Sequence, residues 1–491
     1  MEIGSVLGFL ENRSIIVTGA TGFLAKILIE KILRVQPNVK KLYLLLRAQD
    51  DKAALQRFNN EIIVKDLYKV LKEQMGQKLN SLISEKITIV PGDITFENLG
   101  VKDSNLLEEM WREVDVVVNV AATTNFDERY DVSLALNTFG AINVLNFAKK
   151  CVNLKVLLHV STAYVAGEKS GLILESPYKL GESLNGTQGL DPYEEKKLVD
   201  DKLKELSAEN ASPEETKLAM KELGIQRARK YGWPNTYVFT KTMGEMLVGN
   251  LMGNNMPLVI IRPTIITSTY KDPFPGWAEG VRTIDSLVVG YGTGKLTCFL
   301  GKPTTVIDVI PADMVVNAML VAMVAHAKQP GESIYNIGSS VSNPIEFGRI
   351  QDIGQTYFIN HPWINKEGKP VIVRRVRVLD TMEGFQRYMN LRYMLLLKGL
   401  QLLNAACCQY FHSTYYNLYR KVKFVYRLVE LYVPYLFFDG IFDDMNTEKL
   451  RRAAEKGEAE MDLFYFDPKI INWEDYFTKT HIPGIVKYVF K

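Results

Sequence analysis

Two side chains four residues apart have types that could exchange a proton with a substrate. The segment YVFTK places Tyr237 and Lys241 at positions i and i+4, which share one helix face about one turn apart. A free phenol has a pKa of about 10 and is a poor acid or base at neutral pH. A neighbouring ammonium group favours the phenolate, so the spacing predicts that Lys241 lowers the pKa of Tyr237.

A hydroxyl group would complete such a site. The segment HVSTAYVAG offers Ser161, Thr162 and Tyr164, directly after an apolar run. A tyrosine and a lysine at this spacing are common in helices, so the pair indicates catalysis only if the same chain also holds a cofactor.

A glycine-rich turn near the N-terminus predicts a dinucleotide-binding loop. The segment SIIVTGATGFLA has Gly19, Gly22 and Ala25 at three-residue spacing, between an expected strand and an expected helix. Gly19 permits a tight turn, Gly22 lets the backbone approach a pyrophosphate, and Ala25 lets the helix pack on the sheet. The free N–H groups of the helix N-terminus can then bind phosphate. Glycines that serve only a tight turn are the alternative.

Two charged residues follow the next two expected strands. LLLRAQD ends the second strand with Arg47, whose planar guanidinium matches a ribose 2′-phosphate, so NADP(H) is favoured over NAD(H). A solvated surface arginine is the alternative. Asp93, in GDI, could accept a hydrogen bond from the adenine amino group or simply form a turn.

Alternating strands and helices are expected to position these residues. The expected strands are Ser14–Val17, Lys41–Leu46, Ile87–Val90, Asp115–Val120, Val156–Ser161 and Leu258–Ile261, with helical patterns such as Phe23–Val35 and Ala135–Lys149 between them. Strands that are apolar on both faces and separated by helices predict an α/β fold, a Rossmann-type doubly wound parallel sheet.

Two segments depart from this alternation. Residues from about 179 to 230 are highly charged and helix-prone, which predicts a solvated helical insertion. From about residue 354 the chain becomes rich in Leu, Tyr and Phe. We therefore expect a reductase-type domain over residues 1–355 and a smaller, mainly helical C-terminal domain over residues 356–491.

Composition excludes several classes of protein. The 491 residues are 47% hydrophobic and 23% charged, which is typical of a folded globular chain. The 59 Lys and Arg against 56 Asp and Glu leave a net charge of +3, too balanced to indicate a nucleic-acid binder. Four cysteines make no disulfide framework, so a reducing compartment is expected, and no metal site is predicted. Neither a targeting segment nor a membrane span is predicted.

These motifs together resemble the extended short-chain dehydrogenase/reductase superfamily. TGATGFLA matches its glycine motif, NVAATT (Asn119–Thr124) its fourth-strand motif and YVFTK its Tyr/Lys pair. Longer segments look like the alcohol-forming fatty acyl-CoA reductases, most closely the plant type: GATGFLAKILIEKILR, NVAATTNFDERY, LLHVSTAYVAGE, GWPNTYVFTKTMGE, VIIRPTII, PFPGWAEG and VIPADMVVNAM. The similarity runs nearly from end to end and includes the aromatic-rich C-terminal domain.

The resemblance implies a reaction and a set of roles. A long-chain acyl-CoA would be reduced to a primary alcohol with two NADPH, through an enzyme-held aldehyde. Tyr237 would be the proton donor, Lys241 would lower its pKa and hold the ribose, and Thr162, favoured over Ser161, would orient the carbonyl. Asn137 is a weaker candidate for positioning water or Lys241. The cofactor-binding residues would be Thr18, Gly19, Thr21, Gly22, Phe23, Leu24, Arg47, Asp93, Ala121, Tyr237 and Lys241.

The C-terminal region gives less specific signals. LLLKGLQLLNAACCQYF is expected to be plain helix core, and FVYRLVELYVPYLFFDGIF is either buried or at a bilayer interface. Arg374, Arg375 and Arg377 could bind the phosphates of CoA or guard an exposed strand edge. The acyl chain is expected to lie against residues 263–280 and the C-terminal domain. The resemblance favours the cytosolic face of the endoplasmic reticulum, with peripheral membrane contact through the C-terminal domain; the cytosol is the alternative.

Two other functions fit the same motifs. A different extended short-chain dehydrogenase/reductase, such as a sugar-nucleotide epimerase or a hydroxysteroid dehydrogenase, would not need the hydrophobic C-terminal domain. A non-catalytic dinucleotide-binding scaffold would not need intact Thr162, Tyr237 and Lys241.

Overall fold

A seven-stranded, fully parallel sheet forms the centre of the molecule. The computed structural model describes residues 3–296 and 298–490. The strand order is β11-β7-β5-β4-β1-β2-β3. The strands are β1 (Ser14–Thr18), β2 (Lys41–Leu46), β3 (Ile87–Pro91), β4 (Val116–Asn119), β5 (Val156–Val160), β7 (Pro257–Pro263) and β11 (Gly331–Ile337). The predicted doubly wound α/β fold is confirmed. Strands β2 and β3 are added on one side of β1 and β4 on the other, so the order of strand addition reverses between β1 and β4.

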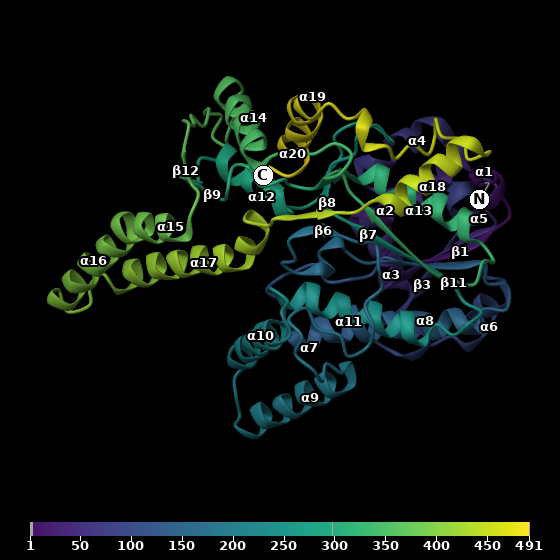
Figure 1. The fold of residues 1–491 in the computed structure, drawn as a ribbon, viewed down its shortest axis with the longest axis horizontal. Helices are drawn as coiled ribbons and strands as arrows, with labels where there is room; N and C mark the ends of the chain where they lie inside the picture. The colour runs from purple at the N-terminus through teal and green to yellow at the C-terminus, as the bar shows by residue number, and fades with distance from the viewer. Residues whose placement is uncertain (1–2, 297, 491) are drawn as a thin grey trace.

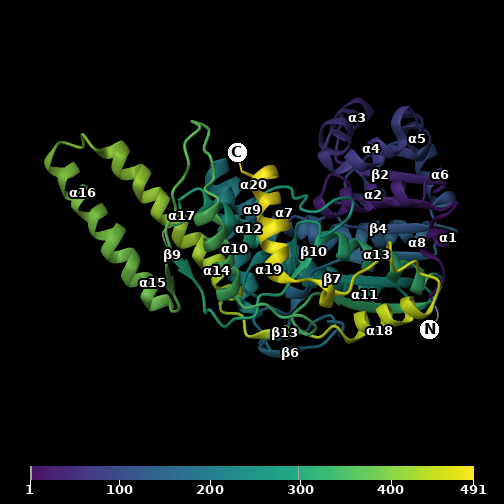
Figure 2. The same cartoon turned by 90° about the horizontal axis from the view of Figure 1, so that it is seen from above.

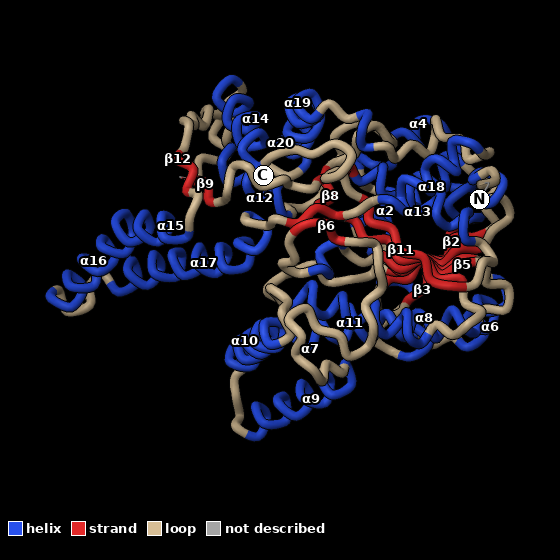
Figure 3. Tube along the Cα trace, viewed as in Figure 1, coloured by secondary structure: helices blue, strands red, loops and turns tan. Residues whose placement is uncertain are grey.

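Helices cover both faces of this sheet (Figures 1 and 3). On one face α2 (Phe23–Val35) and α13 (Ala312–His326) pack in the cluster that includes Ile15 and Val17. On the other face α8 (Gly140–Lys150) packs in the cluster that includes Ile16. Every residue of β1, β4, β5 and β7 is buried, which explains why these strands are mostly apolar on both faces.

The remaining elements surround this three-layer core. The other helices are α1 (Val6–Leu10), α3 (Asp51–Phe58), α4 (Lys69–Met75), α5 (Leu79–Lys86), α6 (Ser104–Glu113), α7 (Tyr130–Ser133), α9 (Pro192–Ala208), α10 (Pro213–Lys230), α11 (Thr236–Leu251), α12 (Thr283–Gly292), α14 (Phe347–Asn360), α15 (Met382–Met389), α16 (Leu395–Ala406), α17 (His412–Leu436), α18 (Met445–Lys456), α19 (Trp473–Asp475) and α20 (Ile482–Tyr488). Three small parallel pairs are β6 (Gly171–Ile173) with β13 (Gly440–Phe442), β8 (Ile265–Thr267) with β10 (Val309–Pro311), and β9 (Cys298–Leu300) with β12 (Arg377–Leu379).

The charged segment expected to be a helical insertion forms α9 and α10. Ser212 caps α10 by accepting a hydrogen bond from the Glu215 amide, and Pro213 occupies the first turn. Glu195 of α9 is buried, where it accepts hydrogen bonds from Tyr130 and pairs with Arg227. The insertion is therefore fastened to α7, on the side of the sheet that carries α11.

The last part of the chain returns to the main core. Leu450, Phe464, Trp473 and Ile485 belong to the same buried cluster as the strands and α2. The boundary between residues 355 and 356 stays a prediction, but residues 445–490 are packed against the sheet-bearing body.

The segment α15–α17 projects from the body as a helical hairpin (Figures 1 and 2). The expectation that the leucine-rich stretch of α16 is plain helix core is wrong, since Leu396 is 70% and Leu402 is 73% exposed. Helices α16 and α17 pack on each other through an inner face that includes Leu397 and Val422. Their outer face has no partner in the described structure. Within the described chain, no helix combines the length and the apolar character needed to cross a bilayer.

Candidate active site

A small cavity at the carboxyl edge of the sheet is built around the glycine-rich turn. Its volume is about 200 Å³, and Gly19, Thr21, Gly22 and Ala121 line it. Gly19 has φ +65°, and a Cβ atom there would lie 2.7 Å from the Ala121 Cα, so only glycine fits. Gly22 precedes α2 without a side-chain cap, which leaves the first N–H groups of the helix free to bind phosphate. The residues present thus fit a dinucleotide.

Three predicted cofactor residues lie behind this cavity instead of in its wall. The Thr18 hydroxyl donates to Asn119 Oδ1 (2.7 Å) and accepts from the Ala121 amide (3.2 Å), so it holds the facing loop. Leu24 is buried in the core. Phe23 stacks on Trp277 with ring centroids 5.0 Å apart.

Two arginine residues line the small cavity. The predicted Arg47 lines it, and so does Arg57 of α3, which the sequence analysis missed. Arg57 donates to the Arg47 carbonyl at 2.8 Å and pairs with Glu61. No motif spacing connects the two arginines, so only the fold reveals that they share a site. Asp93 accepts from the Thr95 amide at 2.9 Å, as a turn-forming residue does, and it also lines the cavity, while its contact with adenine stays a prediction.

A larger cavity of about 560 Å³ is lined by two of the three predicted catalytic residues, and Lys241 is not in its wall. Thr162 and Tyr237 both line it, whereas Ser161 does not. The Ser161 hydroxyl is buried and has no hydrogen-bond partner among the described residues. The geometry therefore supports Thr162 as the hydroxyl beside the tyrosine.

The phenol of Tyr237 is held at the start of α11. The Asn235 side chain caps this helix by accepting from the Val238 amide, and the Tyr237 ring stacks on Phe126 at 5.6 Å. Burial raises the pKa of Tyr237 to about 12, while a hydrogen bond with Thr162 opposes the rise. The phenol is thus fully protonated at neutral pH and suited to donate a proton.

Lys241 does not act on Tyr237 as the spacing predicted. Its Nζ donates to the carbonyl of Val160 at the end of β5, at 2.8 Å. Burial lowers the pKa of Lys241 to about 8, opposed by the nearby Glu245 carboxylate. The prediction that Lys241 lowers the pKa of Tyr237 is wrong for this structure, because burial of the phenol dominates and the ammonium group is directed to the strand.

Asn137 serves the helix packing, and its hydrogen bonds within the described residues go to partners other than Lys241. It lies in a π-helical turn, Leu134–Phe139, and its side-chain amide bonds the Thr123 backbone (3.0 and 3.2 Å) and the Thr240 hydroxyl (3.0 Å). Thr240 precedes Lys241, so Asn137 fixes the position of α11.

The far wall of the larger cavity comes from residues that the sequence analysis did not assign. Helix α17 contributes Phe424, Leu428, Leu431, Tyr432 and Tyr435, about two hundred residues after Tyr237. Their aromatic and leucine content was visible in the sequence, but nothing in it showed which element they would face.

Arg282 is a second unassigned residue of the larger cavity. Its guanidinium carbon lies 4.6 Å from the centre of the Phe23 ring, beside the glycine-rich turn, and its Nε donates to the Glu279 carbonyl at 3.0 Å. Burial lowers the pKa of this guanidinium. Arg282 therefore places positive charge in the wall of the larger cavity, against the first residue of α2.

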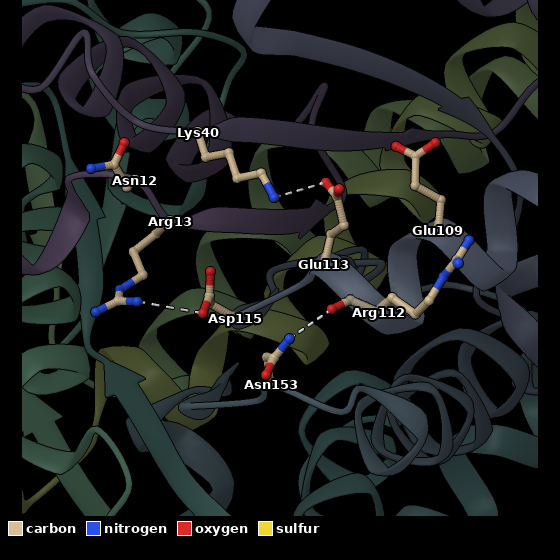
Figure 4. Close-up of a pocket in the computed structure, with 8 residues that line it drawn as sticks. All are labelled: Asn12, Arg13, Lys40, Glu109, Arg112, Glu113, Asp115 and Asn153. Carbon is tan, nitrogen blue, oxygen red and sulfur yellow. Dashed lines mark hydrogen bonds and ion pairs between the residues drawn. The ribbon is translucent and has the colours of Figure 1, made fainter.

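Another hollow, of about 530 Å³, lies at the opposite edge of the sheet (Figure 4). Four of its six charged residues are paired with one another, Arg13 with Asp115 (3.5 Å) and Lys40 with Glu113 (3.3 Å). Parallel sheets bind ligands at their carboxyl edge, and this hollow is at the amino edge, so it is not the candidate site.

The basic cluster expected to bind CoA is also separate from the cavities. Arg374, Arg375 and Arg377 are exposed and line neither cavity, and Arg375 pairs with Asp352 at 3.3 Å. Arg377 begins the short strand β12.

The fold and the site define a nicotinamide-dinucleotide-dependent reductase of the short-chain dehydrogenase type. Among solved structures, the chain is similar to the reductase domain of a nonribosomal peptide synthetase from Mycobacterium tuberculosis, with TM-score 0.55, 18% identity and 99% and 92% of the two chains covered. The terminal R domain of the myxalamid pathway gives TM-score 0.53 at 16% identity, over 94% and 90% of the chains. At these identities the likeness shows the fold.

The family is shown by closer relatives. Two family models, both described as male sterility protein, match residues 17–319 and 392–491. The chain is 59% identical to the alcohol-forming fatty acyl-CoA reductase of Simmondsia chinensis, over 99% of both chains. It is 55% identical to fatty acyl-CoA reductase 1 of Arabidopsis thaliana, over 98% of both. The chain belongs to this family of oxidoreductases, the fatty acyl-CoA reductases, as the resemblance implied.

Proposed function

We propose that this protein reduces long-chain fatty acyl-CoA to the primary alcohol with two molecules of NADPH. The observation that carries the proposal is the pairing of Thr162 and Tyr237 in one cavity with an aromatic and leucine-rich wall, beside a dinucleotide loop. The names of the relatives in Simmondsia and Arabidopsis support the substrate class. An epimerase would not need such a wall.

The residues that would hold NADPH are those of the small cavity. Gly19, Gly22 and the start of α2 fit the pyrophosphate, and Arg47 with Arg57 fits the 2′-phosphate. When bound, NADPH supplies the hydride, one from each molecule. The overall reaction consumes two hydrides and two protons and releases CoA with its free thiol.

Tyr237 supplies the proton at the carbonyl oxygen of the substrate. Negative charge develops on this oxygen as the carbonyl carbon is reduced, and a positioned hydroxyl that donates to it stabilises the transition state. With its pKa at about 12, Tyr237 is in the donor form throughout the neutral range. Thr162, hydrogen-bonded to Tyr237, orients the same oxygen.

Lys241 provides positive charge near this site below a pH of about 8. The Val160 carbonyl accepts a hydrogen bond from one N–H of the Lys241 ammonium group. The other two N–H groups can donate to the nicotinamide ribose. Glu245 on the next turn of α11 favours the charged form of the ammonium group.

The apolar wall retains the intermediate aldehyde. As the C–S bond of the first tetrahedral adduct breaks, the proton on its oxygen passes to the sulfur, so CoA leaves as the thiol and an aldehyde remains whose alkyl chain is still in contact with Leu428, Leu431 and Tyr432. Each buried methylene contributes about 0.8 kcal/mol, so partial burial of a long chain keeps the aldehyde bound while the cofactor is exchanged.

Product analysis of the purified protein tests this function. With NADPH and palmitoyl-CoA, we expect hexadecanol and free CoA, and two NADPH oxidised for each alcohol formed. Tyr237→Phe, which keeps the ring on Phe126, is expected to lose this turnover and retain NADPH binding. Alcohol formation by Tyr237→Phe at the parent rate, or turnover of a UDP-sugar or a steroid instead of acyl-CoA, would reject the proposal.

We further propose that the protein works at the cytosolic face of the endoplasmic reticulum, through peripheral contact of its C-terminal domain. The water-insolubility of long-chain alcohols supports a membrane surface over the cytosol. Co-fractionation of the tagged full chain with reticulum membranes, and its accessibility to protease from the cytosolic side, test this location; recovery in the soluble fraction would favour the cytosol.

A further inference from the structure

The projecting hairpin has an apolar outer surface. We define the hairpin arm as residues 382–429, which comprise α15, a π-helical turn (Asn390–Met394), α16 and the first two thirds of α17. Its exposed apolar side chains are Leu391, Leu395, Leu396, Leu402, Leu403, Tyr410, Tyr416, Leu418, Phe424, Val425 and Leu428. Such an extended apolar surface marks an interaction site, because single exposed leucines on soluble proteins rarely gather in this way.

The hairpin arm is also strongly basic. Between residues 384 and 429 the sequence has no Asp or Glu and seven basic residues, Arg387, Arg392, Lys398, Arg420, Lys421, Lys423 and Arg427. Arg427 is paired with Asp127 at 2.8 Å. The other six are exposed, and among the described residues none has a carboxylate partner. The arm is therefore more positive than the whole chain, whose net charge is +3.

We propose that the hairpin arm docks at the interface of an anionic phospholipid bilayer. Its leucines would enter the boundary between headgroups and acyl chains, and its unpaired cations would contact lipid phosphates. No described helix has the composition to span a bilayer, so the arm lies in the plane of the interface. A second copy of the arm is a poorer occupant, because two such positive surfaces repel each other.

The arm is continuous with the catalytic cavity. Phe424 and Leu428 line the cavity that holds Tyr237, yet they are 62% and 37% exposed. The cavity thus opens along α17 on the side from which the arm emerges. This inference rests on the proposed function and deepens it, since a lipid-borne acyl chain could pass along α17 to Tyr237 without crossing water.

The contact surface overlaps only the first part of the segment that was expected to be either buried or at a bilayer interface, where Phe424, Val425 and Leu428 are exposed. Within FVYRLVELYVPYLFFDGIF, Leu431, Tyr435, Phe438 and Phe442 are buried against the body. The other lipid-facing residues lie upstream, from Leu391 to Leu418.

Vesicle flotation of the full-length protein tests the proposal. We expect binding to phosphatidylcholine vesicles that contain phosphatidylserine, weakened by about tenfold or more without phosphatidylserine or in high salt. The triple variant Leu396→Glu/Leu402→Glu/Leu403→Glu and the charge reversal Arg420→Glu/Lys421→Glu/Lys423→Glu should each abolish binding. Val152→Glu, at a valine 77% exposed on the body, is the matched control and should bind as the parent does.

Two further measurements separate this inference from the proposed function. Tyr237→Phe should float with vesicles as the parent does, even though it loses turnover. The two arm variants should retain turnover of a short-chain, monomeric acyl-CoA in the absence of lipid. Arm variants that float like the parent would overturn the proposal. A parent protein that binds no vesicle but forms a dimer without lipid, with the dimer lost in the leucine variant, would also overturn it.

Thiols at the tip of the arm give an independent readout. Cys407 and Cys408 are exposed in the turn between α16 and α17, whereas Cys151 is buried and Cys298 is partly buried. An environment-sensitive fluorophore on Cys408 in the Cys407→Ser protein should shift to shorter wavelength with phosphatidylserine vesicles and be quenched by lipids spin-labelled near the headgroup. An unchanged spectrum with bound vesicles would place the tip in water and contradict the docking geometry.

Discussion

Arg427 of α17 and Asp127 of the loop before α7 are ion-paired at 2.8 Å across the mouth of the catalytic cavity, although they lie 300 residues apart in the sequence. Asp127 also accepts Lys221 of α10 at 3.0 Å. The Asp127 carboxylate thus joins both α17 and α10 to the loop that follows β4. The buried Leu431 and Tyr435 and the exposed pair of Glu430 with Arg229 also hold α17 at the cavity.

Breaking this junction should affect substrate binding more than chemistry. Arg427→Ala frees the middle of α17, which forms the cavity wall, while Thr162 and Tyr237 keep their contacts. We expect the KM for acyl-CoA to rise severalfold with kcat nearly unchanged, and the free energy of unfolding to fall by about 1 kcal/mol or less, as for partly exposed ion pairs. Steady-state kinetics with acyl-CoA measures the change in KM and the change in kcat separately. Arg229→Ala, which removes an exposed pair with Glu430, is the control and should leave KM unchanged.

The pH dependence should report Lys241 and not Tyr237. The pKa of Lys241 is lowered to about 8, so its charge is present below that pH and is lost as the pH rises through it. We expect kcat/KM to decline above pH of about 8, with no further limb from Tyr237 below pH 10 because its pKa is raised to about 12. Rate profiles from pH 6 to 10 check this.

Lys241→Arg is the informative companion in the pH experiment. Arginine keeps its charge over the whole range, so any activity that survives should lose the decline above pH 8. A decline that persists in Lys241→Arg would assign it to another group.

Gly19→Ala should abolish cofactor binding through a steric contact. The added Cβ would meet the Ala121 backbone at 2.7 Å, in addition to the strain of φ +65°. We expect the Kd for NADPH, measured by fluorescence titration, to rise more than about tenfold while the fold is retained. Gly253→Ala carries similar strain at φ +80° but meets nothing within 4 Å. It should therefore bind NADPH normally; equal losses in both variants would implicate strain alone.

Cofactor preference should depend on both arginines of the small cavity. Arg47→Ser and Arg57→Ser each remove a guanidinium that fits the 2′-phosphate. We expect each to raise the KM for NADPH about tenfold, and the double variant to raise it further, with the KM for NADH unchanged. Parallel assays with the two cofactors measure the ratio. A parallel loss with NADH would show that the arginines support the fold instead of the phosphate.

Local geometry allowed the sequence by itself to determine much of the reductase core. The turn at Gly19 and Gly22, the uncapped start of α2 and the strand–helix alternation all depend on neighbours within a few residues. The same holds for the spacing that puts Tyr237 and Lys241 on one face of α11. Backbone conformation and hydrophobic periodicity encode such features directly, which is why the parallel sheet and the dinucleotide loop could be predicted.

Only the tertiary structure decided which partners those residues meet. The periodicity of α16 is that of a helix in either setting, so the sequence could not tell buried leucines from a projecting arm. It could not show that Lys241 bonds Val160, that Arg57 joins Arg47, or that α17 forms the cavity wall. Such contacts join segments 10 to 300 residues apart. The burial of the Tyr237 phenol, which sets its pKa, likewise depends on the packing of the whole chain.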